Sequence, residues 1–86
     1  MPDVAPTIGL LRRHAEEIRR AEVARAGARL SVLAPEERDA VEVVTAQIVQ
    51  ALLHTPTTRI AEAAAQPEGS RYDAVLRDLF ALDEAV

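Results

Sequence analysis

The chain has 86 residues, a net charge of −4 and no cysteine. This length fits one domain with a small core of its own. Without cysteine there are no disulfides and no thiolate chemistry, and an acidic chain lacks the basic face that a nucleic-acid module needs. No apolar run approaches the ~20 residues of a membrane span, so we expect a soluble, cytoplasmic chain with no membrane partner.

The apolar residues are the material of packed helices. They make up 49% of the chain, yet Tyr72 and Phe80 are the only aromatic ones, so Ala, Val, Leu and Ile supply nearly all of this content. A chain this short buries only part of such a surface within itself. We therefore expect surplus apolar surface to be covered by a partner, most simply a second copy.

The first predicted helix covers residues 7 to 30. Ile8, Leu11, Ala15 and Ile18 recur at helical spacing, and charged residues occupy the opposite side. Glu16 precedes Arg20 by four residues, the favourable order for a helical ion pair. Glycine costs about 1 kcal/mol against alanine inside a helix, so Gly27 should weaken the last turn.

The second predicted helix begins near Pro35, with acidic residues in its first turn, and ends near His54. The stretch "LLHTPTTRI" at residues 52 to 60 then predicts a break, because proline disfavours helical geometry in the residue before it. In this interpretation Thr55 caps a third helix over residues 56 to 66, and Pro56 is its first residue. The histidine and hydroxyls of the stretch mark a junction and not a chemical site.

The fourth predicted helix starts after Gly69, with Ser70 as its N-cap and Asp73 in the capping-box position. Tyr72, Val75 and the apolar residues that follow them form one face of that helix. The whole pattern predicts an all-α fold, a small bundle of three to four helices with short connections.

Residues that could carry chemistry are scarce. His14 precedes Glu17 by three residues, but a metal site needs three or four ligands. The three glycines form no phosphate loop, and neither Ser31 nor Ser70 stands in a nucleophile motif. We therefore expect no catalytic, cofactor-binding or metal-binding residue in this chain.

Four segments in order are more specific than any single motif. They are Leu11-Arg12, Ala15-Glu16, Ile18-Arg19 and Glu22; "PEER" at residues 35 to 38; "LLHTPTTR" at residues 52 to 59; and Tyr72, Leu76-Arg77, Leu79-Phe80 and Leu82. In this order they resemble the carboxyl-terminal dimerisation domain of glutamyl-tRNA reductases. Two positions depart from that pattern, Ala34, where the family usually has serine, and Gly27, where it tends to have leucine.

The resemblance implies that residues 1 to 86 are a homodimerisation module of a larger enzyme, with the first helix forming the end of a long spinal helix. That enzyme uses NADPH to reduce glutamyl-tRNA to glutamate-1-semialdehyde in tetrapyrrole (porphyrin and haem) biosynthesis. Its nucleophilic cysteine and nucleotide loop belong to other domains, so this chain alone would not be an enzyme.

Nine apolar residues are candidates for the core and the dimer interface, without a division between the two: Leu11, Ile18, Val41, Val44, Ile48, Leu52, Leu76, Leu79 and Phe80. Four arginines are candidates for an auxiliary tRNA contact: Arg12, Arg13, Arg19 and Arg20. Interleaved acidic residues favour a self-paired, solvated face for these arginines. An independent helical adaptor that recruits another protein remains the alternative from a different class.

Overall fold

The computed structural model describes residues 3–82, which contain four α-helices and no strand. These are α1 (Ala5–Arg25), α2 (Gly27–Leu30), α3 (Pro35–Ala63) and α4 (Pro67–Leu79). The predicted all-α bundle is confirmed. Within the described range, no helix is both long enough and apolar enough to cross a membrane.

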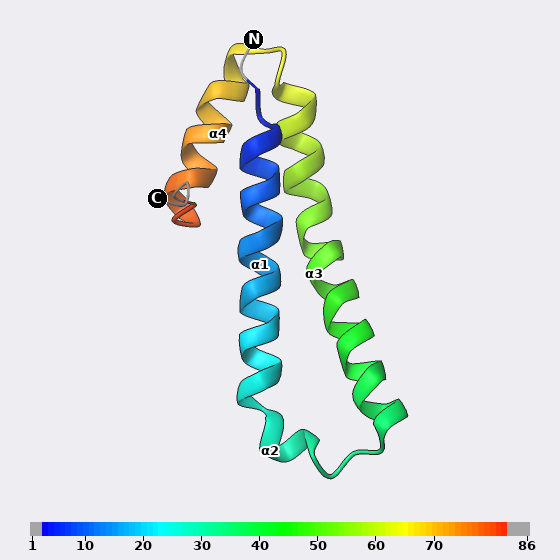
Figure 1. Ribbon diagram of the computed structural model, residues 1–86. Helices are drawn as coiled ribbons and strands as arrows, with labels where there is room; N and C mark the ends of the chain where they lie inside the picture. The colour runs from blue at the N-terminus through cyan, green and yellow to red at the C-terminus, as the bar shows by residue number, and fades with distance from the viewer. Residues whose placement is uncertain (1–2, 83–86) are drawn as a thin grey trace.

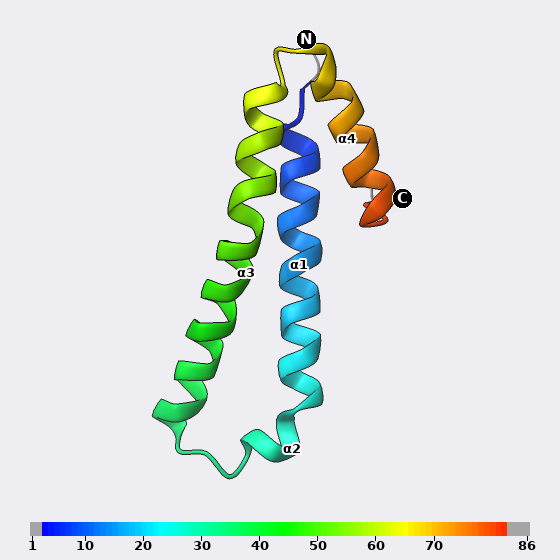
Figure 2. The same cartoon turned by 180° about the vertical axis from the view of Figure 1, so that it is seen from behind.

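Helices α1 and α3 form a long antiparallel pair (Figures 1 and 2). The shorter helix α4 packs against both of them at one end of the pair. The molecule is elongated and measures 51 × 26 × 15 Å. Its radius of gyration is 16.0 Å, against about 12 Å for a compact domain of this length. An elongated arrangement of this kind leaves wide helix surfaces without a neighbour.

The helix boundaries near Gly27 and Pro35 agree only in part with the predicted ones. The single helix predicted over residues 7 to 30 is wrong, because α1 stops at Arg25 with Ala26 as its C-cap and Gly27 is the first residue of the separate short helix α2. The break lies beside Gly27, where a weak last turn was expected. Pro35 is the first residue of α3, as predicted. Ala34 offers no hydroxyl cap, but its own N–H donates to the Glu37 carboxylate at 2.8 Å. Glu37 thus partly replaces the missing serine.

The predicted break at Pro56 is wrong. α3 runs without interruption from Pro35 to Ala63, so Thr55 caps nothing and the separate helix over residues 56 to 66 does not exist (Figure 1). A proline inside a helix removes one backbone hydrogen bond and costs about 3 kcal/mol. Here Thr57, the next residue, and Ile60, one turn later, are buried. The Thr57 hydroxyl also donates to the carbonyls of Leu53, at 2.6 Å, and His54. Burial of these two residues offsets the local cost.

The predicted start of the last helix is also wrong. α4 begins at Pro67, its N-cap is Gln66, and Ser70 lies inside the helix. Gly69 marks close packing instead of a boundary. A Cβ placed on it would lie 2.4 Å from the carbonyl oxygen of Ala63, so α4 leaves α3 with no room for a side chain there.

A tight reversal ends α4. Ala81 has a φ of 51°, in the left-handed region, and its N–H donates to the carbonyl of Asp78. The N–H of Leu82 donates to the carbonyl of Arg77 at 2.8 Å, which completes a Schellman motif. The reversal returns Leu82 to the protein, where it is 4% exposed.

Within residues 3–82, all fully buried residues lie at one end of the molecule, where the start of α1, the last turns of α3 and helix α4 meet. We call this the packed end. They are Val4, Thr7, Leu11, Thr57, Ile60, Gly69 and Leu82. The Thr7 hydroxyl donates to Asp73, which also accepts from Arg77 Nε at 3.1 Å, so α1 is tied to α4. Towards α2, at the far end, no residue from 12 to 56 is fully buried.

Candidate functional site

The nine candidate core and interface residues separate into two groups. Leu11 is 1% exposed and belongs to the core, and Val41 and Leu76 are half-buried. The remaining six are exposed, from 42% for Phe80 to 72% for Leu79, and we call them the open face. They are Ile18, Val44, Ile48, Leu52, Leu79 and Phe80. Most of the apolar pattern read from the sequence therefore lies outside the core of this chain.

An apolar groove of about 510 Å³ runs between α1 and α3 under the end of α4. Ile18, Ile48, Leu52 and Phe80 of the open face line it, and nearly all of its wall is apolar. A second groove, of about 460 Å³, shares Pro56 with the first and continues between α3 and α4. Grooves of this composition fit apolar side chains of another surface better than a polar ligand.

The chain exposes more surface than a compact protein of its mass. Its accessible surface is 6321 Å², whereas a folded monomer of 9.3 kDa is expected to expose about 5,000 Å². The excess is therefore about 1,300 Å² per chain. Two chains covering this excess together would bury an area within the range of about 2,000–5,000 Å² that obligate homodimers use.

An arginine-centred ion network closes one side of the first groove. The Arg19 side chain is only 10% exposed and donates to Glu42 at 2.7 Å, to Thr45 at 3.1 Å and to Glu16. The hydrogen bonds from Arg19, and secondly those from Arg20, lower the pKa of Glu16 to about 2. Glu16 and then Glu42 raise the pKa of Arg19. This network joins α1 to the first half of α3, where no buried apolar residue does so.

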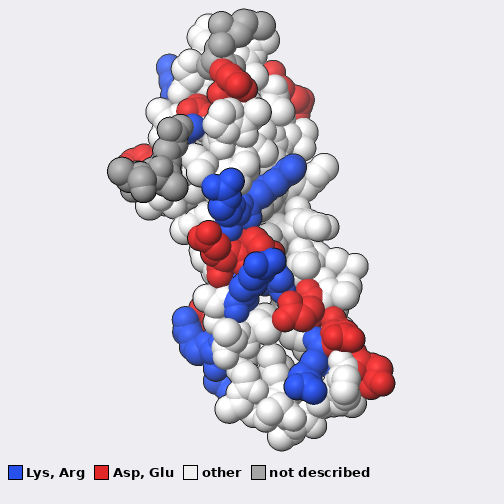
Figure 3. All heavy atoms as spheres, in the orientation of Figure 1, with Lys and Arg blue, Asp and Glu red and all other residues white. Residues whose placement is uncertain are grey.

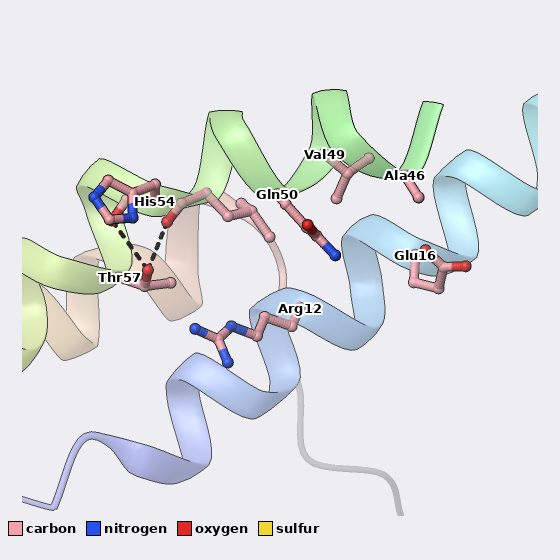
Figure 4. A pocket seen from close by; sticks show the side chains of 8 residues that line it. Arg12, Glu16, Ala46, Val49, Gln50, His54 and Thr57 are labelled. Atoms are coloured by element: carbon pink, nitrogen blue, oxygen red, sulfur yellow. Dashed lines mark hydrogen bonds between the residues drawn. The ribbon is translucent and has the colours of Figure 1, made fainter. Parts of the chain in front are cut away.

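A polar groove of about 450 Å³ between α1 and α3 gathers the side chains that most resemble a site, Arg12, Glu16, Gln50 and His54 (Figure 4). Thr57 also lines it, but its hydroxyl is already used on backbone carbonyls. Among the described residues, every fully buried side-chain polar atom has a partner. No three His, Asp or Glu residues of residues 3–82 gather to hold a metal ion. This groove shows no arrangement that points to catalysis.

The four candidate tRNA-contact arginines are not equivalent. Arg19 is held by protein carboxylates, while Arg12, Arg13 and Arg20 are exposed. Arg20 is 75% exposed but pairs with Glu16 at 3.0 Å. On the face shown in Figure 3, basic and acidic side chains are interleaved along the middle of the molecule. A surface of mixed sign attracts phosphates weakly.

Reasoning from the sequence missed several exposed apolar residues, among them Val43, Tyr72 and Val75, which are 43–55% exposed. Tyr72 and Val75 line the second groove. The helical spacing at residues 72 to 80 contained this signal, because those positions share one face of α4. Periodicity alone does not tell which apolar face is left without a neighbouring helix.

The chain matches the family model described as glutamyl-tRNAGlu reductase, dimerisation domain, over residues 2–82. It is 44% identical over 81 residues to the glutamyl-tRNA reductase of Chloroflexus aurantiacus, which covers 94% of this chain and 19% of that protein. It is 42% identical over 81 residues to the enzyme of Salinispora arenicola, covering 94% and 18% of the two chains. Glutamyl-tRNA reductase 2 of Koribacter versatilis is 39% identical over 82 residues, covering 95% and 19%.

The chain therefore spans about a fifth of the length of these relatives. No solved structure gives a significant match to it. Because the family model covers nearly every residue, the chain belongs to the glutamyl-tRNA reductase dimerisation-domain family.

Proposed function

We propose that this domain holds two copies of a glutamyl-tRNA reductase together by burying its open face against a second copy. One observation carries the proposal: the six residues of the open face are apolar and exposed, and most of them line one apolar groove. Soluble monomers rarely expose large contiguous apolar patches. Membership of a dimerisation-domain family favours this function over that of an independent adaptor.

A pair of matched substitutions tests the proposal. Ile48 and Val32 are both exposed, at 54% and 84%, but Ile48 lines the apolar groove, whereas Val32 lies in the turn after α2. We expect Ile48→Glu to abolish dimerisation in sedimentation velocity, because it buries a charge in the contact. Val32→Glu should leave the dimer intact. A dimer of unchanged affinity in Ile48→Glu, with helix content preserved by circular dichroism, would contradict the proposal.

The chemistry of the parent enzyme belongs, in this proposal, to other domains. They would carry the NADPH-dependent reduction of glutamyl-tRNA in the cytoplasm and supply the cofactor site, while this domain supplies none. The chain has no cysteine, and its polar groove gathers no nucleophile beside a base. Adding the 86-residue chain to NADPH should leave the cofactor's fluorescence unchanged. Specific, saturable binding would overturn this division of labour.

In the same proposal, other domains of the parent enzyme would hold most of the tRNA substrate. Exposed Arg12 and Arg13 are the residues of this domain best placed to add a phosphate contact, since Arg19 is already paired. Filter binding of tRNA at low salt tests such a contact. A real contact must weaken steeply as salt rises and must be reduced in Arg12→Gln and Arg13→Gln.

A further inference from the structure

The middle of α3 has more apolar surface than its own chain covers. Residues 43 to 58 contain no Asp, Glu, Lys or Arg. The row that includes Val49, Leu53 and Thr57 is half-buried or buried, whereas the neighbouring row of Val44 and Ile48 is about half exposed and Leu52 is 71% exposed. A helix that is apolar around most of its circumference is normally covered on more than one side. Within this chain, the exposed row is therefore the side of α3 that is left without a neighbour.

Because α3 continues through Pro56, the exposed row extends over nearly the whole helix. Starting from Ile48, residues at distances of 4, 7 and 11 positions share one side of a helix. Toward the amino terminus these are Val44, Val41 and Glu37, and toward the carboxyl terminus Leu52, Thr55 and Arg59. We call these seven residues the α3 stripe. At these equal distances from Ile48, the stripe carries a carboxylate at one end and a guanidinium at the other.

We infer that α3 packs antiparallel against α3 of a second copy, with the two-fold axis at Ile48. An isologous contact of this kind places each residue against the one at the same distance on the other side of the axis. Ile48 then meets Ile48 of the second copy, Val44 meets Leu52, and Glu37 meets Arg59. This inference rests on the proposed dimerisation and adds to it the contact surface and the direction of the helices.

The surroundings of the stripe fit a second copy as the occupant. Ile18 and Phe80 flank Ile48 and Leu52 in the first groove, and Thr55 and Arg59 line the second groove. The stripe spans 22 positions, or about 33 Å of helix. We expect this stripe and its flanks to cover much of the excess of about 1,300 Å² that each chain exposes. Arg59 takes part in none of the ion pairs identified within residues 3–82, so its charge is available to a second copy.

Single-cysteine variants test the geometry cleanly, because the natural chain has no cysteine. In Ile48→Cys the two thiols meet at the axis, so oxidation or a short bifunctional thiol reagent should convert most of the chain to covalent dimer. Val44→Cys and Leu52→Cys should each react poorly alone, because like positions lie about 12 Å apart along the helices. Their equimolar mixture should crosslink efficiently. Val32→Cys, in the turn after α2, is the matched control and should stay monomeric on the gel.

The outcomes separate this inference from the proposed function. Circular dichroism first checks that each variant keeps its helix content, and sedimentation measures dimerisation of the uncrosslinked chains. A dimer in which Leu79→Cys crosslinks to itself, while Ile48→Cys does not, would overturn the α3 contact and leave dimerisation standing. A native chain that sediments as a folded monomer would overturn both.

Charge reversal tests the direction of the helices independently. Glu37→Arg alone and Arg59→Glu alone each place like charges together at both ends of their homodimers. A mixture of the two variants restores an opposite-charge pair at each end of the heterodimer. We therefore expect heterodimers to exceed the half that random exchange gives, with the preference shrinking as salt rises. Random exchange at low salt would contradict the antiparallel pairing.

Discussion

The packed end and the far end of the molecule use similar residues but are held together in different ways. At the packed end, three helices meet and bury Leu11 and Ile60 to 1% exposure. At the far end only α1 and α3 face each other, nothing is fully buried, and Arg19 bridges the two helices. The comparison indicates that an apolar residue of this chain becomes part of the core only where a third helix covers it. Where none does, the same kind of residue is left for a partner.

Truncating a buried side chain at the packed end should have the largest effect on the free energy of unfolding. We expect Leu11→Ala to lower the free energy of unfolding by about 2–5 kcal/mol, because it leaves a cavity among three helices. Val43→Ala, at a position 55% exposed on α3, should change it by no more than about 0.5 kcal/mol. Urea unfolding of both variants at one protein concentration measures the contrast. Equal losses would mean that the two ends do not differ as described.

A methyl group added at the contact between α3 and α4 should have the next largest effect. Gly69→Ala places a Cβ 2.4 Å from the Ala63 carbonyl oxygen, so the helices must move apart, at a cost of about 1–3 kcal/mol. Gly9→Ala is the matched control, because its Cβ meets nothing within 4 Å. It should stabilise α1 by up to about 1 kcal/mol. Thermal unfolding that shifts in the same direction for both variants would contradict the close packing of α4.

Replacing the left-handed Ala81 at the end of α4 with glycine should raise the free energy of unfolding modestly. Ala81 adopts a left-handed conformation, with a φ of 51°, which costs a residue with a Cβ about 1–2 kcal/mol. Ala81→Gly should recover up to about 1 kcal/mol, since the more flexible glycine loses part of the gain on folding. Urea unfolding provides the measurement. A destabilised Ala81→Gly would contradict the cost assigned to the left-handed conformation of Ala81.

Removing the ion network at the far end should have the smallest effect on stability, and the size of that effect should depend on pH. Pairing lowers the pKa of Glu16 from its ordinary 4.5 to about 2. A lowered folded-state pKa stabilises the protein above the ordinary value, and this contribution is lost as pH falls from about 4.5 to 2. Glu16→Gln should remove that part of the acid dependence. Identical pH profiles of unfolding for the variant and the native chain would show that Glu16 does not contribute.

Helix identity was predictable from the sequence wherever one local signal dominated. Pro35 with its first-turn acids starts a helix, because this effect acts within a single turn. The interruption after α1 falls at Ala26, next to Gly27, which itself begins α2. Pro67 followed by Glu68 repeats the pattern at Pro35, a proline with an acidic residue in the first turn. The observed start of α4 could therefore have been predicted from the sequence. The sequence pattern places a helix boundary at Gly69, because its close contact with the end of α3 is a tertiary feature that local rules do not include.

The path of α3 through Pro56 was not predictable from local rules. Those rules give the cost of a helical proline, but not the burial of Thr57 and Ile60 that offsets it. The apolar candidates were likewise identified by type, while their division between core and open face depends on where α4 stops. That division fixes which residues are available to a partner.

Light scattering on the native 86-residue chain, over a series of concentrations, tests the central claim that the open face binds a second copy. We expect a mass of twice 9.3 kDa over most of the series, falling toward the mass of one chain on dilution. A mass that stays at 9.3 kDa throughout, with helix content intact, would contradict it.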